Sequence, residues 1–212
     1  MKDIDVIGVL QEPVRRRLYE FVAEQREPVS RNAAAEAAGI QRTLAAHHLD
    51  RLVEAGLLET ETRRLTGRSG PGAGRPAKLY RRAETEHELS VPPRDYRIAA
   101  DLLAEVAEEA RLDVQLQEAA RARGRALRGS DVPEANEVAE LLVARGYQPY
   151  DDEGVLRLRN CPFHVLAEAY PPLVCGMNLG LLQGLLEGSG VEVAMDARPG
   201  LCCVAISKNH DH

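Results

Sequence analysis

The chain has 212 residues, of which 44% are hydrophobic and 28% are charged, and its formal net charge is −6. It contains no run of 18 apolar residues, which excludes a predicted transmembrane helix. The acidic start MKDIDVIG lacks the basic region of a signal peptide. We therefore expect a cytoplasmic protein with no membrane partner, in which reducing conditions disfavour structural disulfides.

The charge is unevenly distributed along the chain. Residues 1–95 carry 16 Lys and Arg against 15 Asp and Glu, a net charge of +1, whereas residues 96–212 carry 11 against 18, a net charge of −7. Residues 63–82 contain seven basic residues and no acid. A local basic segment on an acidic protein is what binding to nucleic-acid phosphates requires.

Three helices are predicted within residues 9–55. A first apolar stripe ends before Glu27-Pro28. Ser30 is the expected N-cap of a short helix over 31–38, and Gly39 is its expected left-handed C-cap. A third helix is expected over 41–54, with five residues facing inward: Leu44, Ala45, Leu49, Leu52 and Val53. The last two helices predict a helix-turn-helix.

Two strand-like pieces follow in LLETETRRLTGRSGPGAGRPAKLYRRA, residues 57–83. They predict a hairpin wing around a loop at 67–76, which we expect to be mobile until phosphates order it. Residues 33–59 and the segment GRPAKLYRR resemble the winged helix-turn-helix of bacterial transcriptional regulators of the ArsR/DeoR/MarR-like group. The resemblance covers roughly residues 9–83 and implies that the partner is double-stranded DNA.

In this fold the third helix enters the major groove by its N-terminal end. Arg42 is suited to guanine and Gln41 to adenine. The expected DNA contacts are Gln41, Arg42 and Thr43 at the helix start, His47, His48 and Arg51 further along, and Arg64, Arg75 and Lys78 in the wing. The alternative for each residue is contact with phosphate or solvent alone, and for the domain a role in protein contacts. Neighbouring positions 47 and 48 point about 100° apart, so we do not expect both histidines to bind one metal.

Residues 95–128 lack proline and predict one long helix with an apolar band. We expect this helix to form a homodimer, because winged-helix regulators read two-fold, palindromic operators. An intramolecular strut between domains is the alternative.

The last part of the chain predicts a small α+β sensor domain. A capped helix before Gly146 is followed by a hairpin over 147–160, two helices separated by Pro171-Pro172, and two strands at 191–195 and 202–206. The predicted architecture is therefore α+β, with a winged helix-turn-helix DNA-binding domain at 1–90, a connecting, dimerisation helix at 91–130 and a cysteine-containing sensor domain at 131–212.

All four cysteines lie in this last domain, at Cys161, Cys175, Cys202 and Cys203. Thirteen residues separate the first two, a spacing unlike the C-x₂-C of a zinc ribbon, so we expect a site assembled by tertiary structure. Cys161 is expected at a helix start, which lowers a thiol pKa. Strand alternation is expected to direct Cys202 and Cys203 to opposite faces, so that only one joins the site.

The segments NCPFHVLAEAYPPLVCGMNLGLLQGLLEG and PGLCCVAI resemble the sensor domain of SufR-type iron–sulfur regulators and the related four-vinyl-reductase-like fold. The resemblance implies an iron–sulfur cluster held by Cys161, Cys175 and one of the adjacent pair, for which we choose Cys203. Cys202 and His164 are the possible further ligands, with Glu168 a weaker candidate. Repression of iron–sulfur assembly genes is what the resemblance implies.

Other interpretations of the cysteines remain open. Three cysteines with a histidine or carboxylate also make a zinc site, Cys161 and Cys175 can close a regulatory disulfide, and free cysteines are often core residues. We expect a regulator and not an enzyme, because the last domain has no Gly-rich phosphate loop and no Ser/His/Asp arrangement. A metal-dependent enzyme with an accessory DNA-binding domain is the alternative of another class.

Overall fold

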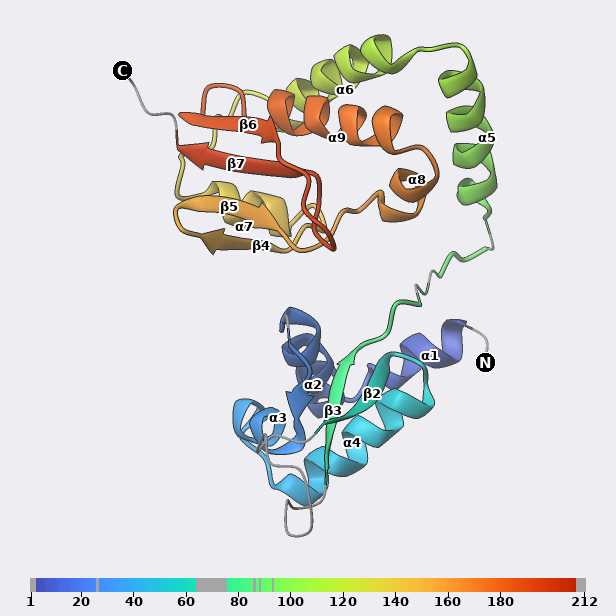
Figure 1. The fold of residues 1–212 in the computed structure, drawn as a ribbon, viewed down its shortest axis with the longest axis vertical. Coiled ribbons are helices and arrows are strands. Elements are labelled where there is room, and N and C mark those ends of the chain that lie inside the picture. Colours follow the sequence, from blue (N-terminus) through green and yellow to red (C-terminus); the bar gives the residue numbers. More distant parts are fainter. Residues whose placement is uncertain are drawn as a thin grey trace. The chain divides into compact units, whose positions relative to one another are not determined.

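The computed structural model describes residues 3–25, 27–63, 76–85, 87, 89–92 and 94–208. The chain divides into two compact units, Met1–Arg94 and Asp95–His212 (Figure 1). Mixed helices and strands in both units agree with the predicted α+β class. Among the described residues, no helix is both long and apolar enough to cross a membrane.

The described residues of the first unit form four helices and a small antiparallel sheet of order β1-β3-β2. Its elements are α1 (Asp3–Val9), α2 (Pro13–Glu24), β1 (Val29–Ser30), α3 (Arg31–Ala38), α4 (Arg42–Glu54), β2 (Leu58–Arg63) and β3 (Ala77–Arg82). The sequence did not predict α1. The other elements confirm the helix-turn-helix and the two strands of the wing.

Local capping explains where the helices of this unit begin and end. The Ser30 side chain accepts a hydrogen bond from Ala33 N at 3.2 Å and starts α3. Gly39, with φ of 65°, ends α3 in the left-handed conformation that a Cβ would disfavour. Both features confirm the sequence prediction. Glu12 caps α2 through hydrogen bonds from Val14 N and Arg15 N at 3.1 and 2.7 Å.

The wing strands β2 and β3 pair in antiparallel register from Leu58 opposite Arg82 to Arg63 opposite Ala77. Residues 64–75 lie outside the described residues, and they include all of the expected wing loop at 67–76 except Pro76. The core beneath the hairpin includes the wholly buried side chains of Leu49, Leu52 and Tyr80. Leu44 was predicted to join this core, but its side chain is 43% exposed. At 100° per residue its position lies about 80° from Leu52 and about 140° from Leu49, at the edge of the buried face of α4.

In the second unit, residues 95–208 form five helices and a four-stranded antiparallel sheet of order β4-β5-β7-β6. Its elements are α5 (Tyr96–Glu109), α6 (Asp113–Arg128), α7 (Val138–Val143), β4 (Pro149–Asp152), β5 (Val155–Leu158), α8 (His164–Ala169), α9 (Pro171–Leu185), β6 (Val191–Met195) and β7 (Val204–Lys208). Helix α9 packs on β6 and β7, and α6 packs along α9 (Figure 1).

The long helix predicted over 95–128 is interrupted between α5 and α6, so the prediction of a single helix is wrong. Arg111 adopts a φ of 55°, and its N–H donates to Glu108 O while Leu112 N donates to Ala107 O, both at 2.9 Å. These are the hydrogen bonds of a Schellman helix end, formed here without glycine. The turn redirects the chain so that α6 runs along α9.

Helices α6 and α9 approach so closely that only glycine fits at their contact. A Cβ at Gly184 would overlap the carbonyl oxygen of Arg121 and lie 3.0 Å from Arg125 N. A Cβ at Gly124 would lie 2.7 Å from Leu185 N, and one at Gly180 would overlap the backbone of Gln117. Backbone has little freedom to move aside in a packed interface. The contact therefore depends on glycine residues, which have no side chain, on both helices.

Replacing Gly184 by alanine should lower the free energy of unfolding of the second unit by about 1–3 kcal/mol or more, because the added methyl group overpacks the interface. Gly176→Ala is the matched control on α9, since its Cβ would meet only Gln117 Oε1 at 3.9 Å. That control should be neutral or stabilising by up to ~1 kcal/mol through helix propensity. Urea denaturation of both variants measures the difference, and equal effects would contradict the close contact.

Candidate nucleic-acid interface and cysteine pocket

The first turn of α4 presents an exposed polar surface. Gln41 occupies the N-cap position without a side-chain capping bond, and Arg42 and Thr43 follow it in the first turn. All three are exposed, as is His47 one turn further on. Leu44, the exposed apolar residue of this helix, lies among them and adds a methyl-bearing surface of the kind that contacts thymine. The side chains of Gln41, Arg42, Thr43 and His47 are therefore all exposed in the first half of α4.

His48 does not belong to this surface, which corrects its prediction as a DNA contact. The residue is 9% exposed, and its Nδ1 lies 3.7 Å from Glu12 Oε2. Burial lowers the pKa of His48, although the neighbouring carboxylate of Glu12 opposes the shift. The ring packs at an angle of 61° to that of His47, with centroids 5.4 Å apart. One histidine is thus at the surface and the other inside.

The predicted wing contact Lys78 is held by the recognition helix itself. Its Nζ donates to Asp50 Oδ1 at 2.7 Å, and this hydrogen bond raises the pKa of Lys78. Tyr80 Oη donates to the same oxygen at 3.3 Å and accepts from Arg31 Nη2 at 3.5 Å. Asp50 therefore ties α4 to β3 and α3. The sequence analysis missed Asp50 and Arg31, because both are far from Tyr80 in the sequence and meet it only in the folded unit.

Most described basic residues of the wing are paired with acids. Arg81 donates to Glu59 at 2.7 Å, and Arg63 donates to Glu27 at 3.4 Å. Arg51 on α4 pairs with Glu54 at 2.9 Å. The predicted contacts Arg64 and Arg75 lie outside the described residues. Ion pairs between exposed side chains are weak. These basic side chains can therefore exchange a carboxylate partner for a phosphate.

All four cysteines line one cavity of about 170 Å³ in the second unit. Cys161 lies between β5 and α8, Cys175 lies on α9, and Cys202 and Cys203 directly precede β7. The expectation that strand alternation separates the last two is wrong, because β7 begins only at Val204. The cavity is several times the ~30 Å³ that one water occupies in the liquid, so it has room for a group of several atoms.

The four thiols form a connected chain of sulfur atoms. Cys202 accepts hydrogen bonds from Cys161 and Cys203, and these bonds lower its pKa to about 3. The hydrogen bond to Cys202 and burial raise the pKa of Cys161, contrary to the predicted helix-start effect. Cys203 hydrogen-bonds both Cys202 and Cys175, and its pKa is likewise raised. Cys202 therefore lies between Cys161 and Cys203 and interacts with both.

Two buried polar side chains adjoin these sulfurs, and the sequence analysis missed both. Asn178 on α9 is fully buried, and its Nδ2 donates to Cys202 Sγ at 3.3 Å. Tyr147, 3% exposed, donates its hydroxyl to Asn178 Oδ1 at 2.6 Å. The available signal was an asparagine inside the otherwise apolar run LVCGMNLGLL.

His164 and Glu168, the other candidate ligands, lie on the wall of the same cavity. His164 Nε2 is 3.3 Å from Glu168 Oε1, and their side chains are 59% and 69% exposed. Within the described part of the chain, no group of three or more His, Cys, Asp or Glu is arranged to hold a single metal ion. The four thiols are soft donors and are spread along the cavity.

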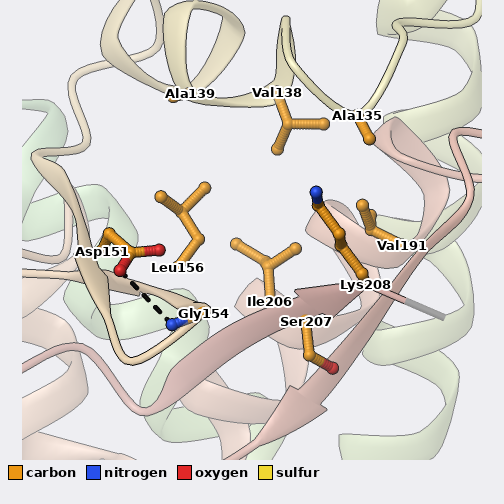
Figure 2. Close-up of a pocket in the computed structure, with 10 residues that line it drawn as sticks. All are labelled: Ala135, Val138, Ala139, Asp151, Gly154, Leu156, Val191, Ile206, Ser207 and Lys208. Carbon is orange, nitrogen blue, oxygen red and sulfur yellow. Dashed lines mark hydrogen bonds between the residues drawn. The ribbon is translucent and has the colours of Figure 1, made fainter. Parts of the chain in front are cut away.

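A second cavity of about 140 Å³ is lined mainly by α7 and the sheet. Figure 2 shows apolar side chains of Val138, Leu156 and Ile206 around it, with Asp151 and Lys208 at its sides. It contains no cysteine or histidine. The thiol chemistry of this unit therefore belongs to the cysteine cavity.

Residues 10–61 match the family model described as a helix-turn-helix domain. The match runs from Leu10, directly after α1, into β2 and includes α4. No curated protein and no solved structure matches the chain. The family match supports a DNA-binding transcriptional regulator of the ArsR-like type and does not extend to the second unit.

The buried, neutral state of His48 predicts a pH dependence of stability. Because burial lowers the pKa of His48 in the folded state below the ordinary histidine value of about 6.5, the unfolded state binds the proton more tightly. Stability is then lost as the pH falls through about 6.5, with a slope of at most ~1.4 kcal/mol per pH unit. His48→Gln should lose less stability than the wild type between about pH 7.5 and pH 5 in urea denaturation. His47→Gln, at the exposed neighbour, should keep the wild-type dependence, and identical slopes in all three proteins would contradict this account.

Proposed function

We propose that the chain is a dimeric, winged helix-turn-helix repressor whose second unit binds an iron–sulfur cluster through its cysteines. The helix-turn-helix match supports DNA binding. The observation that carries the sensor proposal is the convergence of four cysteines, from three separate segments, on one cavity. This combination favours a regulator that responds to iron–sulfur or redox status. A zinc- or thiol-responsive regulator is the second candidate.

Direct DNA readout is assigned to the start of α4. Arg42 is exposed and makes no hydrogen bond or ion pair with the described part of the chain, so its guanidinium is free for a guanine edge. Gln41 and Thr43 flank it, and Lys78 follows on the wing for phosphate contact. In this arrangement Asp50 positions Lys78 and releases it when a phosphate competes for the ammonium group.

Replacing Arg42 by alanine should lower the affinity for the operator about 5–150-fold, the range expected for one lost bidentate base contact. Affinity for a scrambled duplex should change much less, because phosphate contacts dominate non-specific binding. Fluorescence anisotropy at fixed salt concentration measures both. Arg123→Ala, which removes an exposed arginine of the second unit, is the control. A parallel loss on both duplexes would show that Arg42 contacts only the backbone.

The proposed dimer is formed by α5. This helix has no buried residue, although it carries apolar residues every four positions: Ile98, Leu102 and Val106 are 59%, 57% and 62% exposed. Leu103 extends the patch at 72% exposure. Burying each side chain against a second copy would stabilise the dimer by about 1.5–3 kcal/mol. A two-fold protein also suits a palindromic operator.

Leu102→Asp should dissociate the dimer, because a carboxylate cannot be buried in an apolar interface without a partner. Sedimentation equilibrium should show monomers at concentrations where the wild type is dimeric, and operator affinity should fall in parallel. Val143→Asp, which alters an equally exposed valine on α7, should leave the dimer intact. A monomeric wild type would refute this part of the proposal and favour the intramolecular strut.

The proposed ligands of the cluster are Cys161, Cys175, Cys203 and Cys202. Cys202 is preferred to His164 as the fourth ligand, because it lies at the centre of the sulfur chain and His164 is exposed and paired with Glu168. A bound iron–sulfur cluster supplies a one-electron redox change and sensitivity to oxygen and iron supply. The chain holds the four sulfur atoms in place, with Cys202 buried and the other three half-buried.

A route from the cavity to α5 supports the regulatory part of the proposal. Helix α8 lies between Cys161 and Cys175 in the chain, and Tyr170 at its end donates a hydrogen bond to Asp101 of α5. Regulation requires that the ligated cavity favour one arrangement of α5 over another, since a group that binds both equally shifts nothing. Tyr170 is placed to transmit that difference.

Anaerobically purified protein tests the cofactor. We expect a brown sample with iron and sulfide, and loss of the visible absorption in each of Cys161→Ser, Cys175→Ser, Cys202→Ser and Cys203→Ser. His164→Ala should retain the absorption. A colourless sample that contains zinc would replace the cluster by the zinc candidate, and a metal-free sample would leave thiol redox chemistry.

A further inference from the structure

The buried pair Asn178 and Tyr147 demands a specific explanation. Both belong to a core that is otherwise apolar, and burying an amide or a phenol costs about 1–3 kcal/mol unless each polar atom finds a partner. Here the partners are each other and two sulfur atoms. Asn178 Nδ2 lies 3.3 Å from Cys202 Sγ and 3.9 Å from Cys161 Sγ.

Tyr147 fixes which end of the amide faces the cysteines. Its hydroxyl donates to Asn178 Oδ1 at 2.6 Å, and burial raises the pKa of Tyr147, so the proton stays in place. The carbonyl oxygen of the amide therefore accepts from Tyr147, and Nδ2 lies within donating distance of the two sulfurs. Sulfur accepts hydrogen bonds most strongly when it carries negative charge, as it does when it ligates a metal.

We propose that Asn178 is a positioning residue that donates its two amide hydrogens to the ligating sulfurs of Cys202 and Cys161, with Tyr147 holding the amide in that orientation. Hydrogen bonds to ligand sulfur stabilise the added electron of a reduced cluster and so raise its reduction potential. The inference rests on the proposed function, because it assumes a cluster in the cysteine cavity. Asn178 thereby sets the potential at which the sensor responds.

Redox titration of the anaerobic, full-length protein tests this role. In Asn178→Leu, a substitution of similar size without donors, the ratio of reduced to oxidised cluster at a fixed potential should fall about tenfold, which is ~59 mV for a one-electron couple. Tyr147→Phe should lower the midpoint in the same direction by less, since the amide stays but loses its fixed orientation. Gln183→Leu is the matched control: it removes an amide from the same helix that donates to Val193 O at 3.1 Å, away from sulfur. Its midpoint should equal that of the wild type.

The outcomes separate this inference from the proposed function. A wild type without a cluster overturns both. A wild-type cluster whose midpoint is unchanged in Asn178→Leu and Tyr147→Phe overturns only the role of Asn178. If Asn178→Leu loses the cluster, a lowered midpoint in Tyr147→Phe supports the inference, whereas an unchanged one makes Asn178 a structural residue.

Discussion

The close approach of α6 to α9 is the constraint on which the second unit depends. Gly124, Gly180 and Gly184 let the two backbones touch, so the axial position of α9 is fixed to within a fraction of a helical turn. Cys175 and Asn178 lie on the same helix, between the double proline and these contacts. Their place opposite Cys161 and Cys202 is therefore set by a contact that contains no cysteine. Rigid placement matters because hydrogen bonds to sulfur weaken steeply with distance and angle.

The DNA-binding unit uses the opposite strategy, in which charged side chains are held only by weak, exchangeable partners. In the absence of nucleic acid, the positive charges of its basic side chains are neutralised by ion pairs with Asp50, Glu54 and Glu59. This pairing explains how a unit with a nearly balanced charge can still offer a basic surface. Exposed ion pairs are weak, so exchanging these carboxylates for phosphates would cost little, and the pairing lets the unbound surface avoid self-repulsion.

The features that sequence analysis predicted correctly in this structure are those encoded within a few residues. Ser30 and Gly39 identify both ends of α3 because capping is local chemistry. The interruption at Arg111 escaped prediction because a non-glycine residue adopts the left-handed conformation there, favoured by how α6 packs and not by its neighbours in sequence. The cysteine pair was misjudged for a similar reason, since the start of β7 depends on pairing with β5 and β6. The sequence did not predict that Asn178 lies beside the cysteines, because its contacts with Tyr147 and Cys202 exist only in the tertiary structure.

The position of α8 between two of the cysteines that line the cavity has an entropic consequence. Cys161 and Cys175 enclose 13 residues, 162–174, so any group bound to both closes a loop. Closing a loop of about 15 residues removes ~3 kcal/mol of conformational entropy from the opened chain. Helix α8 has six residues, too few to remain helical unaided. A group bound in the cavity would therefore stabilise the folded state of α8 and, with it, the Tyr170 contact. Loss of that group would favour local unfolding of α8.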